Sequence, residues 1–217
     1  MAETGRQRIS ASIARERVSA IIRMDDQGLA ARAFEAATEG GFRLVEFTMT
    51  TPGALELIAR FAENPDLIVG AGTVMTPSMA RDAVGAGAKF LVSPHCDPEV
   101  VAAAAALDVP SIPGAYTPTE METAHRLGVD FVKVFPEPAG GIDFIRAVRA
   151  PLPHLRLFPT AGVTPDNFVE YLDAGCAGVG FVRSLFVPSD LAARDFGAIR
   201  DRARRITQRL AEWRSAR

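Results

Sequence analysis

Lys133 is the residue whose type and surroundings most directly indicate chemistry in this sequence. It is one of two lysines among 24 basic side chains, and it lies within the apolar run Phe131-Val132-Lys133-Val134-Phe135. Burying an ammonium group is costly, and burial lowers the pKa of lysine so that a nucleophilic amine is available near neutral pH. The run therefore predicts Schiff-base chemistry on a carbonyl compound. The alternatives are a lysine that reaches solvent at the strand end, or one that pairs with a carboxylate.

A second charge lies in a similar apolar setting. Glu46 follows Leu44-Val45 and precedes Phe47. One interpretation is an ion pair with Arg43 or with Lys133, and the other is a carboxylate that moves protons for the lysine chemistry. A buried acid and a buried amine that project into the same space form a more specific pattern than either residue alone. We therefore predict that Glu46 and Lys133 form a catalytic pair.

The two charges meet only if the elements that carry them surround a common interior. Short apolar runs predict eight strands, at residues 18–22, 44–47, 68–70, 90–92, 111–112, 131–134, 157–160 and 178–181. Amphipathic segments between them predict helices at residues 28–38, 52–61, 77–85, 98–107, 118–127, 141–150 and 165–174. This strict alternation predicts an α/β fold with a parallel sheet, of the (β/α)8 TIM-barrel type. The alternative, an open doubly wound sheet, is disfavoured because no Gly-x-Gly-x-x-Gly follows the first strand.

Turn residues mark the ends of the predicted helices. Thr-Pro or Asp-Pro steps at 51–52, 76–77, 97–98, 117–118 and 164–165 offer a capping side chain followed by proline at the first helical position. Glycines at 40–41, 85, 128 and 175 suit left-handed helix ends. A helix at 8–16 is predicted to cover the barrel floor, and a long charged helix at 191–217 to end the chain. No linker is visible, so residues 1–217 are predicted to form a single domain.

Composition narrows the classes of partner and compartment. The net charge of −2 gives no reason to expect nucleic acid or an anionic membrane as a partner. Cys96 and Cys176 show no metal-ligand spacing, and His95 beside Cys96 is better explained as a rim histidine, so neither a metal nor a cofactor is predicted. The sequence has no bilayer-spanning apolar stretch and no apolar segment of a signal peptide. These features predict a cytoplasmic protein.

Polar residues follow several predicted strands at the end where catalytic groups collect in this fold. The candidates at these positions are Arg23, Thr48, Thr50, Thr73, Pro94, Gly162, Arg183 and Ser184. The loops after the last two strands are the usual phosphate cradle of such barrels, and Gly162, Arg183 and Ser184 offer an amide, a guanidinium and a hydroxyl there. Ordinary glycine turns are the alternative interpretation of these loops.

Several ordered motifs resemble one enzyme family. They are Val45-Glu46-Phe47-Thr48, Gly70-Ala71-Gly72-Thr73-Val74, Ser93-Pro94, residues 112–120, Lys133-Val134-Phe135-Pro136 and residues 158–163. Their order and spacing are similar to those of the class I 2-keto-3-deoxy-6-phosphogluconate (KDPG) and 4-hydroxy-2-oxoglutarate (KHG) aldolases, a group that also includes 2-keto-3-deoxy-6-phosphogalactonate aldolases. The similarity extends over roughly residues 15 to 188.

The resemblance implies a role for each candidate residue. Lys133 would form the Schiff base with a small-molecule 2-keto acid, and Glu46 would be the general acid/base. Thr73 and Pro94 would line the pyruvate pocket, Phe135 would pack beside the lysine, and Gly162 and Ser184 would hold a phosphate. The expected reaction is reversible cleavage of a 2-keto-3-deoxy (phospho)sugar acid or 4-hydroxy-2-oxo acid to pyruvate and an aldehyde. The family also implies a homotrimer that needs no metal.

This sequence departs from the family pattern at the substrate-contacting positions. Thr50 replaces the arginine that grips the substrate carboxylate in many KDPG aldolases. Ala161 replaces a glycine of the common Thr-Gly-Gly, and Phe181-Val182-Arg183 precedes Ser184 where the family has Gly-Gly. Glu137 adds a negative charge after the lysine strand. The alternatives are therefore an aldolase or decarboxylase for a different, unphosphorylated 2-keto acid, or a non-catalytic barrel that binds a sugar acid.

Overall fold

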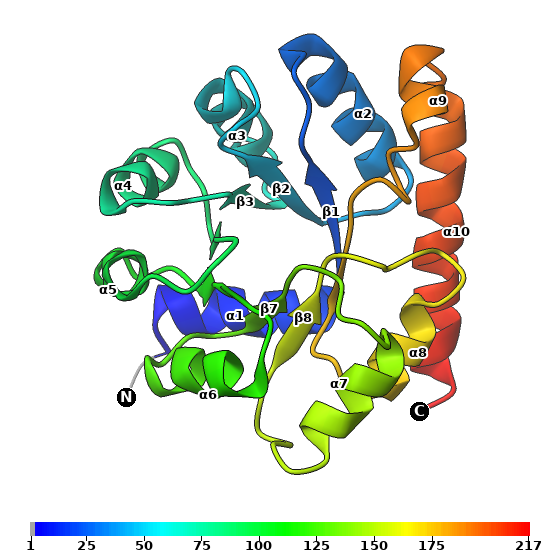
Figure 1. Ribbon diagram of the computed structural model, residues 1–217. Helices are drawn as coiled ribbons and strands as arrows, with labels where there is room; N and C mark the ends of the chain where they lie inside the picture. The colour runs from blue at the N-terminus through cyan, green and yellow to red at the C-terminus, as the bar shows by residue number, and fades with distance from the viewer. Residues whose placement is uncertain (1–2) are drawn as a thin grey trace.

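The computed structural model describes residues 3–217, in which helices surround a centre of short strands (Figure 1). The strands are β1 (Val18–Ile22), β2 (Leu44–Thr48), β3 (Ile68–Gly72), β4 (Leu91–Val92), β5 (Ser111–Ile112), β6 (Gly114–Ala115), β7 (Val132–Val134), β8 (Leu157–Pro159) and β9 (Val179–Phe181). The helices are α1 (Gly5–Glu16), α2 (Gln27–Glu39), α3 (Ala54–Ala62), α4 (Pro77–Gly85), α5 (Pro98–Ala106), α6 (Pro118–Arg126), α7 (Ile142–Arg149), α8 (Phe168–Asp173), α9 (Pro188–Ala192) and α10 (Phe196–Ser215).

All strand pairs are parallel, which confirms the predicted α/β class, but the strands form two sheets rather than one closed sheet of eight. Six strands pair in the order β5-β4-β3-β2-β1-β9, and three pair in the order β6-β7-β8. The strand predicted at 111–112 is confirmed as β5, whereas β6 was not predicted. Pro113 separates the two and has no N–H to donate to a ladder, and β5 and β6 belong to different sheets.

Two apolar clusters hold the strands in place. The larger one lies between the strands and the outer helices, where Phe34 of α2 packs against Phe47 of β2 with ring centroids 4.3 Å apart. The smaller one joins inward-facing side chains of several strands to Ile13 of α1, and consists of Ile13, Leu44, Phe90, Val92, Ile112, Phe131 and Phe158. Side chains two residues apart on a strand share a face. Glu46 and Lys133 therefore lie one layer above Leu44 and Phe131, on the same enclosed side.

The predicted amino-terminal helix is confirmed, and it covers one end of the strands (Figure 1). Its first turn is fixed by Thr4, which forms a capping box with Gln7. The Gly5 amide donates to Asp108 Oδ2 at 2.9 Å, and Arg6 Nε donates to Asp130 Oδ2 at 2.8 Å. These contacts and the burial of Ile13 close the amino-terminal ends of the strands, so the carboxyl ends are left for a site.

The long charged helix predicted at 191–217 is confirmed as α10, but its predicted start is wrong, because α9 and a turn precede it. α9 ends at Ala192, and α10 begins after Asp195, whose side chain accepts from the Ala198 amide at 2.9 Å. Between them Arg194 adopts a left-handed backbone with φ 53°, which turns the chain. α10 then runs beside α2 (Figure 1), where a Cβ on Gly40 would approach the Arg200 carbonyl oxygen to 2.6 Å. Because the chain turns between the two helices, α9 lies near the carboxyl ends of the strands.

The helix caps agree with the sequence at three of the five proline steps. Thr76, Asp97 and Thr117 cap α4, α5 and α6 as predicted. The predictions at Thr51 and Thr164 are wrong, since α3 begins after Gly53 and α8 after Asn167. The Thr51 hydroxyl is instead bound to the Met24 amide, and the Thr164 hydroxyl accepts from two amides of its own turn. Side-chain to backbone bonds of this kind compete with helix formation.

Two further predictions concern helix ends and membrane spans. Gly85 is the last residue of α4, and the left-handed backbone predicted there lies instead at Gly87, with φ 109°.

Over residues 3–217, none of the helices combines the length and apolar composition that crossing a bilayer requires.

Candidate active site

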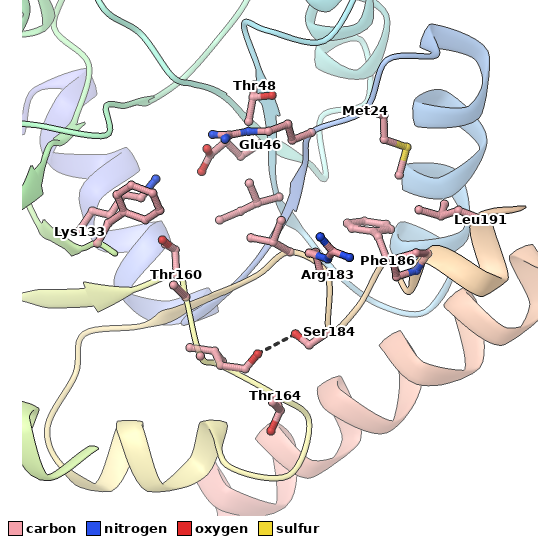
Figure 2. Close-up of a pocket in the computed structure, with 18 residues that line it drawn as sticks. Met24, Glu46, Thr48, Lys133, Thr160, Thr164, Arg183, Ser184, Phe186 and Leu191 are labelled. Atoms are coloured by element: carbon pink, nitrogen blue, oxygen red, sulfur yellow. Dashed lines mark hydrogen bonds between the residues drawn. The ribbon is translucent and has the colours of Figure 1, made fainter. Parts of the chain in front are cut away.

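A cavity of about 760 Å³ opens at the carboxyl ends of β1, β2, β7, β8 and β9 (Figure 2). Eight of the residues singled out in the sequence line it: Arg23, Glu46, Thr48, Lys133, Phe135, Gly162, Arg183 and Ser184. Its volume is within the range of small-molecule sites, and its position is that of the catalytic site in parallel α/β barrels.

Lys133 lies on β7 with 6% of its surface exposed. Its strand is held between β6 and β8, where Lys133 is in register with Gly114 and Phe158. The Nζ atom lies 4.8 Å from the centroid of the Phe135 ring. Burial lowers the pKa of the amine; the Glu46 carboxylate opposes this effect and the Arg23 guanidinium adds to it. The side chain thus presents to the cavity an amine that loses its proton more readily than an exposed lysine does.

Glu46 lies on β2 with 2% of its surface exposed. Its carboxylate occupies the space beside Gly72 of β3, so that a Cβ on Gly72 would overlap Oε1. Burial raises the pKa of this acid, although the positive charges of Lys133 and Arg23 lower it. The proposed ion pair with Arg43 is not formed, because Arg43 Nη1 donates to the carbonyl oxygens of Thr38 and Phe42 at 3.1 and 3.2 Å.

The acid and the amine share the cavity without a direct ion pair. Neither Glu46 nor Lys133 takes part in any ion pair found among residues 3–217. Burial shifts their pKa values toward each other, which favours the neutral acid and the neutral amine. Such a pair can supply a nucleophile and a proton carrier to one substrate.

Arg23 lines the cavity from the segment after β1, and it is hydrogen-bonded to a threonine that follows β3. Its Nη2 donates to Thr73 Oγ1 at 3.1 Å. Thr73 has a left-handed backbone with φ 58°. Thr73 itself does not line the cavity. Arg23 and Arg183 both line the cavity, and they are the guanidinium groups among its lining residues.

Thr50 and Pro94 also lie outside the cavity lining. The Thr50 hydroxyl is hydrogen-bonded to Thr48 Oγ1 at 3.0 Å, so it contacts the wall through Thr48. The backbone of Pro94 packs against Gly114, where a Cβ would overlap its carbonyl group. This close approach places the β4 end directly beside β6 and the lysine strand.

The loop after β8 also lines the cavity, through residues 160–164. Its Gly162 has a left-handed backbone with φ 73°, and the carbonyl oxygen accepts from Asn167 Nδ2 at 2.9 Å. The Ser184 hydroxyl donates to the Val163 carbonyl oxygen at 2.7 Å (Figure 2). The Glu137 carboxylate fills the space that a Cβ on Gly162 would need. The two residues predicted to hold phosphate are thus already in contact with other groups of the protein.

Several lining residues were missed in the sequence because their types carry no chemical signal. Met24, Val182, Phe186, Pro188 and Leu191 form an apolar part of the wall. Pro188 and Leu191 belong to α9, which was not predicted as a separate helix. Met24 and Leu191 lie on the other side of the cavity from Lys133 (Figure 2). Their place in the cavity wall follows from the position of α9, which the sequence did not predict.

Within residues 3–217, His, Cys, Asp and Glu side chains do not gather in groups of three or more that could hold an ion. His95 does not line the cavity.

Comparison with known proteins identifies the family. The family described as KDPG and KHG aldolase matches residues 9–201. The 2-dehydro-3-deoxy-phosphogluconate aldolase of Treponema pallidum (strain Nichols) is 36% identical over 195 residues, which cover 87% of this chain and 90% of the relative. The KHG/KDPG aldolase of Escherichia coli (strain K12) is 35% identical over 180 residues, which cover 80% and 83%.

A solved structure supports the same relationship. KDPG aldolase from Legionella pneumophila, with pyruvate captured at low pH as a covalent carbinolamine intermediate, superposes with a TM-score of 0.82 at 29% identity, covering 91% of this chain and 97% of that chain. The fold and the family define an enzyme of the carbon–carbon lyase class. The chain belongs to the KDPG and KHG aldolase family.

Proposed function

We propose that this protein is a Schiff-base aldolase that reversibly cleaves a 2-keto-3-deoxy (phospho)sugar acid or a 4-hydroxy-2-oxo acid to pyruvate and an aldehyde. The observation that carries the proposal is the joint burial of Lys133 and Glu46 at one end of a single cavity. The covalent capture of pyruvate in the Legionella relative supports it.

In the proposed cycle Lys133 supplies the electron sink. Its neutral amine adds to C2 of the keto acid, the Glu46 acid gives its proton to the departing hydroxyl, and loss of water leaves a protonated imine and the Glu46 carboxylate. Glu46 accepts the C4 hydroxyl proton through a water while the C3–C4 bond breaks. The bonding electrons move into the imine to give an enamine, and the aldehyde leaves. Protonation of the enamine at C3 and hydrolysis of the imine release pyruvate and restore Lys133.

We assign the substrate carboxylate to Arg23. The residue that performs this task in many relatives is Thr50 here, and its hydroxyl is bonded to Thr48. Arg23 lines the cavity, is fixed by Thr73, and influences the pKa of both Glu46 and Lys133. A guanidinium binds a carboxylate more strongly than a hydroxyl does. Thr48 and Phe135 complete the wall beside the lysine.

A second candidate keeps the lysine chemistry and changes the substrate. The same imine supports cleavage or decarboxylation of an unphosphorylated 2-keto acid. Glu137 favours this candidate, because its carboxylate lies against Gly162, where the family implies a phosphate. A panel of 2-keto acids with and without a terminal phosphate separates the two candidates.

We also propose that the two sheets form the wall of one closed eight-position barrel and that residues 1–217 make one domain. β5 and β6 would then count as a single strand interrupted at Pro113. The hydrogen bond from the Ala177 amide to the Leu157 carbonyl oxygen, at 2.9 Å, supports closure between β8 and β9. A homotrimeric assembly and a cytoplasmic location remain predictions from the sequence.

The deciding experiment is borohydride trapping. The protein is incubated with pyruvate, reduced, digested and analysed by peptide mass spectrometry. We expect a stable adduct on Lys133, which is retained by a Lys89→Ala variant and lost from a Lys133→Ala variant. No adduct on folded protein, under conditions that label a control aldolase, would contradict the Schiff-base proposal.

A further inference from the structure

The cavity has a second end that the proposed reaction does not use. Lys133 and Glu46 lie on one side, and Met24, Phe186 and Leu191 lie on the other (Figure 2). These three side chains come from the segment after β1, the segment after β9 and α9. Both ends belong to one continuous space, so a molecule bound to Lys133 can extend toward the apolar end.

The apolar end is part of the packed interior. Phe186 is 4% exposed and packs against Phe34 of α2 with ring centroids 5.6 Å apart. Met24 and Leu191 are half-buried and pack against the same core cluster. A wall fixed in this way is preorganised, which reduces the entropy lost when an apolar group binds to it.

Two of the features expected to hold a phosphate, the Ser184 hydroxyl and the turn at Gly162, are by contrast engaged or opposed. The only proton of the Ser184 hydroxyl is donated to the Val163 carbonyl oxygen. The Glu137 carboxylate lies against Gly162, and like charges repel. Arg183 is the remaining positive group on this side of the wall; Arg183 and Glu137 are both exposed, so water screens both charges.

We propose that the cavity selects a 2-keto acid whose aldehyde-derived half ends in an apolar group, such as a phenyl ring, rather than in a phosphate. The inference rests on the proposed aldolase function and names its substrate class. The carboxylate and C2 carbonyl bind between Arg23 and Lys133. The apolar group fills the end formed by Met24, Phe186 and Leu191.

A binding measurement tests the inference without requiring turnover. The probe is 2-oxo-4-phenylbutanoate, which has the distal ring but lacks the C4 hydroxyl needed for cleavage, and pyruvate is the reference. Calorimetric titration uses the full chain with Lys133→Ala, so that no imine forms; Lys133→Met is the substitute if that variant does not fold. We expect the phenyl compound to bind at least 10-fold more tightly than pyruvate, since pockets discriminate apolar groups by roughly this factor.

Paired variants locate the effect. In the same background Leu191→Asn should reduce the preference for the phenyl compound about 10-fold, since it places an amide at the apolar end. Leu127→Asn is the matched control, because Leu127 is an exposed leucine at the end of α6, outside the cavity lining. Equal affinity for the two probes, or an equal effect of both variants, would overturn the inference.

Turnover of the unmodified protein gives a second test. With pyruvate as donor, we expect a higher kcat/KM for benzaldehyde than for glyceraldehyde 3-phosphate, and the opposite order would overturn the inference. A change of molecular mass caused by Leu191→Asn would identify the apolar end as an interface between copies and would also overturn it. Failure of borohydride trapping together with a retained phenyl preference would reject the Schiff base while leaving the substrate class standing.

Discussion

The two ends of the cavity are built differently. Glu46 and Lys133 are carried by strands, and each is held in register by hydrogen-bonded neighbours on both sides. The opposite end is carried by the segments after β1, β8 and β9 and by the short helix α9. Strand-borne groups are fixed by the whole sheet, whereas loop-borne groups depend on local side-chain contacts.

The difference separates the reaction from its specificity. A change at the strand-borne end alters the groups proposed to react. The surrounding β ladder holds the neighbouring backbone in place, so no other side chain can move into their positions. A change at the loop-borne end alters which molecule fits while the amine and the acid stay in place. The departures from the family pattern at Glu137, Ala161 and Arg183 lie at or beside the loop-borne end, whereas Thr50 is hydrogen-bonded to Thr48 of β2.

The largest expected effect tests the lysine itself. Lys133→Ala should lower kcat by at least roughly 10³-fold, because the nucleophile and the electron sink are both lost. Lys89→Ala is the matched control and should keep full activity, since Lys89 is exposed outside the cavity. Steady-state kinetics with circular dichroism to verify folding makes the comparison. Substantial turnover by the folded Lys133→Ala variant would reject covalent catalysis.

The next effect concerns the acid/base group. Glu46→Gln should reduce kcat by on the order of 10² to 10⁴, as is typical when such a group is lost. Burial raises the pKa of Glu46, so the carboxylate forms at a higher pH than for an exposed glutamate and the rate should rise as pH increases through that pKa. This acidic limb should disappear in the variant. An identical pH–rate profile in both proteins would remove Glu46 from the role.

A smaller effect is expected at the substrate carboxylate. Arg23→Leu should raise KM for the keto acid roughly 10- to 100-fold, which corresponds to loss of a charge-assisted hydrogen bond. The Arg23 cation lowers the pKa of both Glu46 and Lys133, so its removal should also shift the pH–rate profile to higher pH.

Two further variants make the Arg23 test specific. Arg23→Lys should recover part of the affinity and most of the pH profile. Arg81→Leu, on the outer helix α4, should change neither quantity. An unchanged KM in Arg23→Leu would show that another group binds the carboxylate.

The smallest effect addresses the loop-borne end. Glu137→Gln should raise kcat/KM for a phosphorylated aldehyde relative to an unphosphorylated one by about 3- to 10-fold, since a single screened charge contributes about 1 kcal/mol. Competition assays with both aldehydes measure the ratio. Glu63→Gln, an exposed carboxyl group after α3, is the control. A ratio that moves equally in both variants would mean that Glu137 does not influence specificity.

Local signals in the sequence were enough to predict most of the frame. β1 and α4 have the predicted bounds, and the caps at Thr76, Asp97 and Thr117 follow directly from residue type. The sequence also brought Glu46 and Lys133 together, because two charges inside apolar strands leave few arrangements that avoid burying them alone.

Other features depended on contacts between distant segments. Nothing local indicates that the Thr51 hydroxyl binds the Met24 amide rather than capping a helix. The turn at Arg194, which separates α9 from α10, requires a left-handed residue that is not glycine. The apolar end of the cavity was missed for the same reason, since Met24, Phe186 and Leu191 look like ordinary core residues until α9 is placed.

Gly72 of β3 lies directly against the carboxylate of Glu46 on β2. It carries no reactive group, yet the position of the Glu46 carboxylate requires that residue 72 have no side chain. Any sequence change at this position must therefore be accompanied by relocation of the acid, whereas a Cβ on Gly85 would meet no atom within 4 Å. The residue types allowed at position 72 of β3 are thus limited by the Glu46 carboxylate on β2, so these two positions are expected to change together or remain unchanged.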